Sequence, residues 1–216
     1  MSGLKAPDLL KCTSQADRKT FPQIETQPNR RRGANYKLRT RCLSILLGSQ
    51  LQIKTTMVRI TEALTEPAIS QARTLFREYS QLQGIELCLQ DFEAELTSLP
   101  GLYGRPTGRL LLALHDGPAA HDTPIGCVAL RKLEEGTCEM KRLYVRPGFR
   151  SEGAGRALVE NLIAEARAMD YKKLRLDTLP FMREAQALYR NLGFVQIPPY
   201  LKNRPADTLY FELALR

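Results

Sequence analysis

The residues most capable of chemistry lie in a short run of arginine and glycine, R-S-E-G-A-G, at positions 150–155. The run follows a strand-like segment and precedes an amphipathic one, so Arg150, Gly153 and Gly155 are expected in a tight loop that opens a helix. A helix N-terminus presents unpaired backbone N–H groups and the positive end of its dipole. Glycine lets an anion approach those amides closely, so the sequence predicts an anion site of the phosphate-binding kind.

Taken alone, this run leaves other interpretations open. A Gly-x-Gly at the start of a helix also suits a tight turn that binds nothing. The Gly-Lys-Ser/Thr ending of a P-loop is missing. A dinucleotide fingerprint would need a third glycine near Ala157 or Leu158, and none stands there. The run therefore indicates an anion site without identifying the anion.

The segments around the loop alternate between strand and helix patterns. Helices are expected from a cap at Thr65 to Gly84 and at 90–98, 153–169 and 182–191. Strands are expected at 58–60, 109–115, 124–133, 137–145, 173–178, 195–197 and 208–215, with a loop at 116–123 and a hairpin turn at 134–136. This order predicts an α/β (α+β) fold, with a mixed, mostly antiparallel sheet, helices on both faces and a parallel strand pair around the loop.

Cysteine and histidine usage argues against several kinds of site. The five cysteines show no C-x-x-C spacing, and the only histidines are His115 and His121, so neither a metal nor a Ser-His-Asp triad is expected. Cys127 and Cys138 are expected in the core, although Cys138 beside Glu139 stays open as a site residue. No apolar run approaches the roughly 20 residues of a membrane span, and no signal-like segment is seen. We expect a cytoplasmic protein with reduced thiols and no membrane partner.

The net charge of +9 is concentrated in one part of the chain. Residues 1–56 hold eleven of the 32 basic and three of the 23 acidic residues, which leaves 21 basic and 20 acidic residues in 57–216. The sequence therefore predicts a basic, mostly disordered extension over 1–56, with a short helix near 43–47, and one domain over 57–216. A near-neutral domain gives no sign of a nucleic-acid partner, except through the extension.

Three interpretations of the extension stay open. It is a targeting presequence, a basic arm that binds nucleic acid, or sequence upstream of a true start at Met57. Met57 immediately precedes the first well-patterned strand, which favours the last interpretation. The acidic residues in 1–56 count against a presequence, because such segments usually avoid them.

Two motifs in this order resemble the GNAT superfamily of acyl-CoA-dependent N-acyltransferases. The first is R-S-E-G-A-G at 150–155 after the strand K-R-L-Y-V at 141–145, and the second is A-Q-A-L-Y-R-N-L-G-F at 185–194. The second segment is similar to the family pattern A-x-x-L-Y-x-x-x-G-F. The resemblance covers about residues 57–216 and implies the family's fold, in which two parallel strands splay apart at the acyl-CoA site.

The resemblance implies that acetyl-CoA is a cosubstrate and that its pyrophosphate lies on the amides of the loop. The residues implied to bind it are Leu143, Tyr144, Val145, Arg150, Ser151, Glu152, Gly153, Ala154, Gly155 and Arg156. The pantetheine arm would pair with residues 143–145 like a short strand, and an N–H near Leu143 would polarise the thioester carbonyl. Many relatives carry glycine where Ser151 stands, so here the phosphate must be held by backbone amides, with the Glu152 side chain turned away.

The resemblance also suggests two catalytic residues. Tyr189 would donate a proton to the departing thiolate, since a phenol with a pKa near 10 is matched to that group. Tyr189 could instead only cover the core beside Leu188 and Leu192. Glu139 is the candidate base, acting directly or through water. A regular strand would put Glu139 on the same face as Leu143, and a β-bulge would put the two on opposite faces. The alternative interpretation, an ordinary exposed Glu139 paired with Lys141, stays open.

The acceptor is the least readable part of the sequence. Family members shape the acceptor site with the first helices and the last hairpin, so Tyr79, Tyr103 and Tyr200 are candidates to line a small pocket. Arg73 or Arg77 is a candidate to bind an acceptor carboxylate through two hydrogen bonds. Solvated arginines and surface tyrosines are the competing interpretation of each.

The sequence thus predicts an N-acetyltransferase that moves an acetyl group from acetyl-CoA to a primary amine of a small-molecule or amino-acid-like acceptor, by direct attack in a ternary complex. The alternatives are a non-catalytic acyl-CoA-binding sensor and a protein N-acetyltransferase tethered by its basic tail. Dimers are common in the family, so a homodimer is compatible with the sequence. The acceptor's identity and the acyl chain length are not fixed by the sequence.

Overall fold

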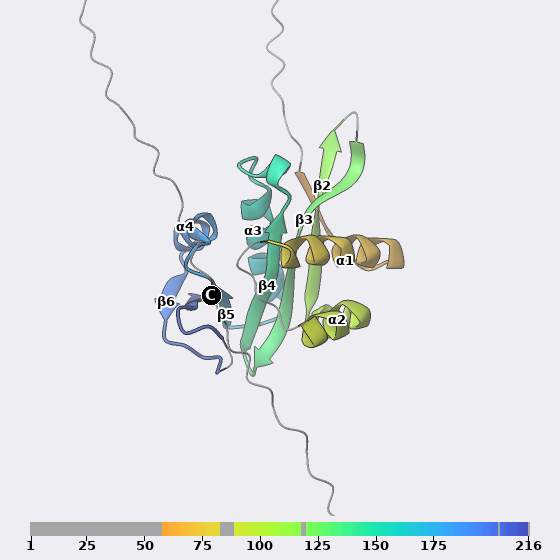
Figure 1. The fold of residues 1–216 in the computed structure, drawn as a ribbon. Helices are drawn as coiled ribbons and strands as arrows, with labels where there is room; N and C mark the ends of the chain where they lie inside the picture. The colour runs from red at the N-terminus through yellow and green to blue at the C-terminus, as the bar shows by residue number, and fades with distance from the viewer. Residues whose placement is uncertain (1–57, 83–88, 118–119, 203, 216) are drawn as a thin grey trace, which may run out of the picture. The chain divides into compact units, whose positions relative to one another are not determined.

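A computed structural model describes residues 58–82, 89–117, 120–202 and 204–215 (Figure 1). The described strands form one seven-stranded sheet in the order β1-β2-β3-β4-β5-β7-β6. They are β1 (Val58–Glu62), β2 (Arg109–Gly117), β3 (Ala120–Glu134), β4 (Thr137–Val145), β5 (Lys173–Thr178), β6 (Val195–Ile197) and β7 (Leu209–Ala214). Neighbouring strands are antiparallel except for β4 and β5, which are parallel. The predicted mixed, mostly antiparallel sheet is confirmed.

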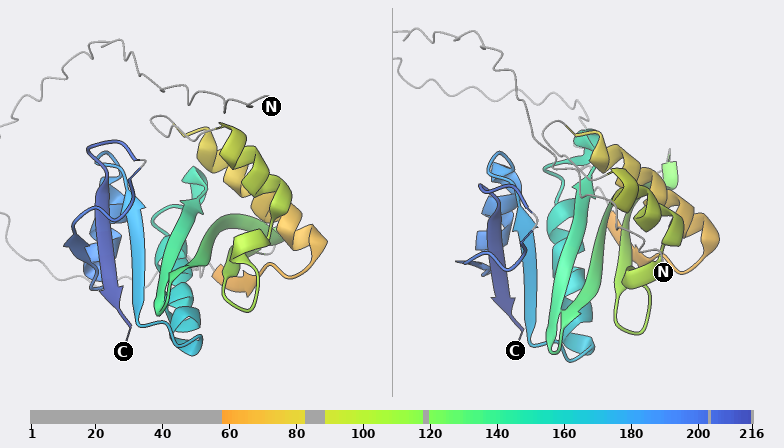
Figure 2. Two further views of the ribbon diagram at one scale, coloured as in Figure 1. Left: turned by 90° about the horizontal axis from the view of Figure 1, so that it is seen from below. Right: turned by 60° about the horizontal axis from the view of Figure 1, so that its bottom comes forward.

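Helices cover both faces of the sheet. The described helices α1 (Glu66–Ser80) and α2 (Leu89–Ser98) pack on one face, and α3 (Ala154–Ala168) and α4 (Arg183–Asn191) pack on the other (Figure 2). In β2, Leu110 and Leu112 join the core with α1 and α2, whereas Leu111 and Ala113 join the core with α3. Because successive strand residues point to opposite faces, the continuous apolar run of β2 is buried on both sides.

Local signals explain where the helices begin and end. The side chain of Thr65 accepts a hydrogen bond from the Ala68 N–H at 3.5 Å, and Pro67 lies in the first turn of α1, as expected. Gly193, with φ of 89°, follows the last turn of α4, where the sequence predicts a left-handed glycine. The Phe194 N–H then donates to the Tyr189 carbonyl at 3.0 Å, which fixes the end of α4.

Three features differ from the sequence predictions. The expected loop at 116–123 is mostly strand, because β2 and β3 continue their ladder to the pair Gly117↔Ala120. Glycine and proline in that segment suggested a loop, but strand pairing continues through the described residues on both sides of 118–119. Helix α1 ends at Ser80, and Gly84 lies outside the described residues. Two short 3-10 turns, η1 (Gly101–Tyr103) and η2 (Pro147–Phe149), have no counterpart in the predictions.

Predictions about the N-terminal extension are not addressed by the structure. Residues 1–56, the short helix near 43–47 and the start at Met57 all lie outside the described residues. Across the described part of the chain, no helix combines the length and the apolar character that crossing a membrane requires.

The parallel pair β4 and β5 separates soon after it forms. Backbone pairing joins residues 137–139 of β4 to residues 173–175 of β5, and no later pair is formed between them. Both strands continue beyond this point, β4 to Val145 and β5 to Thr178. Figure 2 shows the blue strands β5 and β7 diverging from β4. The edge of β4 that faces β5 therefore lacks a strand partner over its second half.

A β-bulge lies in the half of β4 that pairs with β3 but not with β5. Ala129 of β3 pairs with Lys141, and Cys127 pairs with Tyr144, so β4 contains one extra residue. Arg142 has a φ of 57°, which is the left-handed region that bulges use. Beyond the bulge, Leu143 packs with the core under α3, and Tyr144 packs with the core under α1. The bulge thus reverses the alternation of side chains, so Glu139 and Leu143 point to opposite faces of the sheet. This is the bulged geometry that the sequence left open beside a regular strand.

Candidate active site

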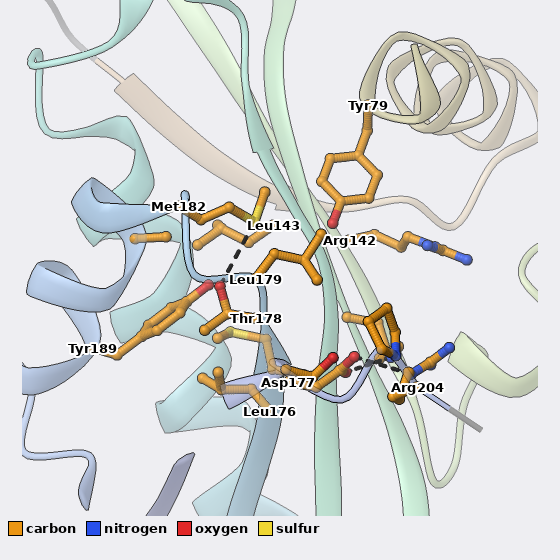
Figure 3. A pocket seen from close by; sticks show the side chains of 15 residues that line it. Tyr79, Arg142, Leu143, Leu176, Asp177, Thr178, Leu179, Met182, Tyr189 and Arg204 are labelled. Carbon is orange, nitrogen blue, oxygen red and sulfur yellow. Dashed lines mark hydrogen bonds and ion pairs between the residues drawn. The ribbon is translucent and has the colours of Figure 1, made fainter. Parts of the chain in front are cut away.

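A cavity of about 260 Å³ lies where β4 and β5 separate (Figure 3). Its walls come from β4, β5, α4, the end of α1 and the segment before β7. One side is mainly apolar, with Leu143, Leu176 and Met182, and the other side carries charged groups. Figure 3 shows Tyr189 reaching in from α4 and Tyr79 reaching in from α1.

Tyr189 is held rigidly at the apolar side of the cavity. Its ring packs against Phe194 and Phe211, with ring centroids 5.8 and 6.2 Å away, and the residue is 5% exposed. Burial raises the pKa of the Tyr189 hydroxyl above its ordinary value, with smaller contributions from Tyr79 and Asp177. The phenol therefore stays protonated to a higher pH than an exposed tyrosine does, and the protonated form is the one that can donate a proton.

The opposite side of the cavity carries a row of alternating charges, which we call the charged row. It consists of Arg131, Glu139, Lys141, Asp177 and Arg204. An oxygen of Glu139 lies 2.6 Å from Arg131 and its other oxygen lies 3.9 Å from Lys141. Asp177 accepts from Lys141 at 2.7 Å through Oδ1 and lies 3.1 Å from Arg204 through Oδ2. Lys141, Asp177 and Arg204 line the cavity.

Glu139 is the most enclosed member of the charged row. Its side chain is fully buried, and it is not among the residues that line the cavity. Oε2 accepts from Arg131 at 2.8 Å, and Oε1 accepts from the Tyr200 hydroxyl at 3.0 Å. The sequence allowed an exposed Glu139 paired with Lys141, whereas the structure places it inside with Arg131 as its main partner.

The bulge of β4 is tied to α2 by an ion pair. Arg142 donates through Nε to Glu95 at 2.9 Å and pairs with the same carboxylate through Nη2. Its guanidinium lies 5.2 Å from the Phe92 ring centroid and 5.9 Å from that of Tyr79. These contacts stabilise the left-handed conformation of Arg142 and place a neutralised ion pair beside the cavity.

The residues predicted to shape the acceptor site are distributed differently by the structure. Tyr79 lines the cavity. Tyr103 is buried and donates to Glu95 at 2.7 Å, and Tyr200 donates to Glu139, so both hold carboxylates rather than line this cavity. Arg73 donates to the Leu96 carbonyl at 3.0 Å, and Arg77 is exposed on α1, so neither is among the lining residues.

The loop before α3 has the backbone geometry of an anion site. Ser151 and Gly153 have φ values of 66° and 86°, and the first hydrogen bond at the start of α3 runs from the Ala157 N–H to the Gly153 carbonyl at 2.9 Å. The amides before Ala157 therefore have no acceptor within the helix. A Cβ added at Gly153 would meet no atom within 4 Å, so the space over the loop is open. These features fit a phosphate group.

The three charged side chains of this loop, Arg150, Glu152 and Arg156, differ in their contacts. Arg150 is exposed and donates through Nε to the Val145 carbonyl at 3.1 Å, which joins the loop to the end of β4. Arg156 pairs with Glu160 one turn along α3. Oε2 of Glu152 is buried without a hydrogen-bond partner. The backbone, with Arg150 nearby, is thus the part of the loop whose geometry best suits an anion.

Several residues of the cavity were not found from the sequence. Asp177 had a usable signal, since Leu174 and Leu176 mark the core side of β5 and place Asp177 on the other face. Lys141 was considered only as a partner of Glu139. Arg204 lies in an irregular segment, where periodicity gives no information about side-chain direction.

Comparisons with known proteins point to one family. The model of the acetyltransferase (GNAT) family matches residues 70–194. An uncharacterised N-acetyltransferase of Schizosaccharomyces pombe is 33% identical over 164 residues, which span 76% of this chain and 98% of that protein. An uncharacterised N-acetyltransferase of Dictyostelium discoideum is 28% identical, over 74% of this chain and all of that protein.

A solved structure shares the fold. The crystal structure of a GNAT-family acetyltransferase from Staphylococcus aureus superposes with a TM-score of 0.62 at 19% identity, covering 74% of this chain and all of that one.

Proposed function

Since the chain belongs to the acetyltransferase (GNAT) family, we propose that it moves the acetyl group of acetyl-CoA to a primary amine of a small, amino-acid-like acceptor. We assign this activity to residues 57–216. The observation that carries the proposal is the cavity between β4 and β5. It is lined both by the edge of β4 that has no strand partner and by the buried side chain of Tyr189, which carries a hydroxyl group.

The loop and the free edge of β4 would bind acetyl-CoA. The amides of residues 151–156 would hold the pyrophosphate, with Arg150 at the surface beside them. The unpaired backbone of residues 143–145 would hold the pantetheine arm in the way that a sheet edge accepts an added strand. The N–H of Leu143 would then donate to the thioester carbonyl.

Tyr189 would supply the proton that the departing thiolate needs. It lines the same cavity as Leu143, and burial keeps its hydroxyl protonated. A phenol that is already protonated and fixed by ring packing can donate without a further conformational change.

Glu139 is our candidate for the final proton acceptor. It is fully buried and does not line the cavity, so a proton from the amine would reach it through an intermediary such as water. The Tyr200 hydroxyl on Oε1 and Arg131 on Oε2 would hold the carboxylate in place for this role.

Direct attack by the amine is favoured over a covalent acyl-enzyme. Burial raises the pKa of the Cys138 thiol to about 12 and also raises the pKa of Cys127. Neither of these cysteines is among the residues lining the cavity. A buried protonated thiol is a poor nucleophile, so a ternary complex is the simpler route.

A screen of primary amines with acetyl-CoA tests the proposed activity. The full chain should release free CoA with some amines of amino-acid size, at a rate that depends on the amine concentration. Release is measured with a thiol reagent in the presence and absence of each amine. Binding of acetyl-CoA without release for any amine would contradict the proposal and indicate a sensor.

Replacing Tyr189→Phe should lower kcat by about 10²-fold to 10⁴-fold, the usual contribution of a positioned proton donor. The Tm should stay close to that of the wild type, because the ring and its contacts are kept. Since burial raises the pKa of Tyr189, the wild-type rate should not fall through deprotonation of this residue up to about pH 9. An unchanged kcat in the variant would remove the donor role.

Replacing Glu139→Gln should lower kcat by about 10²-fold, the usual contribution of a positioned base. The matched control is Glu134→Gln, which removes an exposed carboxylate paired with Arg175 on the same sheet. The control should keep the wild-type kcat. If the Glu139 variant keeps it as well, Glu139 is not the base.

A further inference from the structure

The charged row has one more positive than negative group. Arg131, Lys141 and Arg204 are cations, and Glu139 and Asp177 are carboxylates, and they alternate along the row. Burial is the largest single effect on the pKa of Asp177 and raises it, but Lys141 and Arg204 together outweigh burial, so the pKa is lowered. Asp177 is therefore ionised at neutral pH, and the row carries a formal charge of about +1.

The two ends of the row are cations, Arg131 and Arg204, and their side chains are 27% and 35% exposed. Between them the exposed fraction is 0% for Glu139, 9% for Lys141 and 16% for Asp177. A charge that is partly desolvated and incompletely paired favours an anionic partner. Arg131 does not line the cavity, whereas Arg204 does, so Arg204 is the most exposed member of the row that a ligand in the cavity can reach.

The guanidinium of Arg204 keeps donors available. Within the described part of the chain, its ion pair is with Asp177 and runs through Nε. A guanidinium carries five N–H donors in a planar fork, so the terminal nitrogens suit a second carboxylate. Arg142 differs, because both Nε and Nη2 are already paired with Glu95.

The size of the cavity limits what this carboxylate belongs to. A volume of about 260 Å³ is at or below the low end of ordinary ligand pockets. The same space must also receive the acetyl group. A small acceptor that carries its amine and its carboxylate close together fits this space.

We propose that the acceptor is an anionic amino compound, an amino acid or a close analogue, and that Arg204 selects it by binding its carboxylate. This inference rests on the proposed acetyl transfer and names the acceptor class and a residue that determines specificity. It replaces Arg73 and Arg77, which lie away from the cavity, as the source of the carboxylate-binding cation.

Asp177 is a competing candidate, as an anchor for the acceptor's ammonium group. Both of its oxygens are already engaged, Oδ1 by Lys141 and Oδ2 by Arg204. An amine held as an ammonium ion also has no lone pair with which to attack the thioester. Asp177 is therefore better described as the residue that positions Lys141 and Arg204.

The test compares L-amino acids with their α-carboxamides as acceptors, using wild type, Arg204→Gln and Arg204→Lys. The matched control is Lys202→Gln, which removes an exposed cation two residues away. We expect Arg204→Gln to lower kcat/KM for the amino acids by about 10-fold to 100-fold, the effect of losing a charged hydrogen bond. The carboxamides should change by less than about 3-fold. Arg204→Lys should restore part of the loss, and Lys202→Gln should match the wild type.

A binding measurement separates this inference from the proposed activity. Dissociation constants of N-acetyl amino acids and their carboxamides are measured calorimetrically on the CoA-loaded full chain, where no turnover is needed. Weaker binding of the acids, but not of the carboxamides, to Arg204→Gln supports the inference even if no amine is acetylated. Equal losses for acids and carboxamides, or no loss for either, would overturn it while leaving the acetyl-transfer proposal to be decided by CoA release.

Discussion

The separation of β4 from β5 is the constraint on which the candidate site depends. Backbone pairing ends at Glu139 and Arg175, and just past this point the side chains of Lys141 and Asp177 form an ion pair between the two strands. Arg142 ties the bulge of β4 to α2 through Glu95. The gap is thus bordered by ion pairs on one face, while apolar side chains under α3 and α4 fill the other.

This arrangement gives the two faces of the gap different chemistry. Past the bulge, Leu143 points toward α3 and α4, where Tyr189 lies in an apolar and enclosed setting. Before the bulge, Glu139 and Lys141 belong to the charged row on the opposite face. One extra residue in β4 therefore puts Leu143 on the side of Tyr189, the proposed proton donor, and leaves Lys141 with the charged row, where we propose that the acceptor binds. The apolar setting favours the protonated phenol, and the charged row favours an anionic ligand.

The sequence predicted the order of helices and strands along the chain, a mixed sheet with helices on both faces, and the loop before α3, because alternation, caps and glycine positions are local signals. It also identified Tyr189 and Glu139 as candidates. It did not predict that Arg131 and Tyr200 enclose Glu139, since those contacts join residues 8 and 61 positions apart. It did not predict Arg204 either, because nothing local fixes where an irregular segment directs a side chain. A row of charged residues that are distant in the sequence can be recognised only from the tertiary structure.

The most direct test of the account is hydrogen–deuterium exchange on the full chain with and without saturating acetyl-CoA. Exchange should slow for the amides of residues 143–145 and 151–156 and stay unchanged in β1. In Gly153→Glu, which adds a carboxylate to the open loop, the same protection should need a higher concentration of acetyl-CoA. Unchanged exchange at residues 143–145 in the wild type, with acetyl-CoA bound, would show that the separated edge of β4 is not where the thioester arm lies.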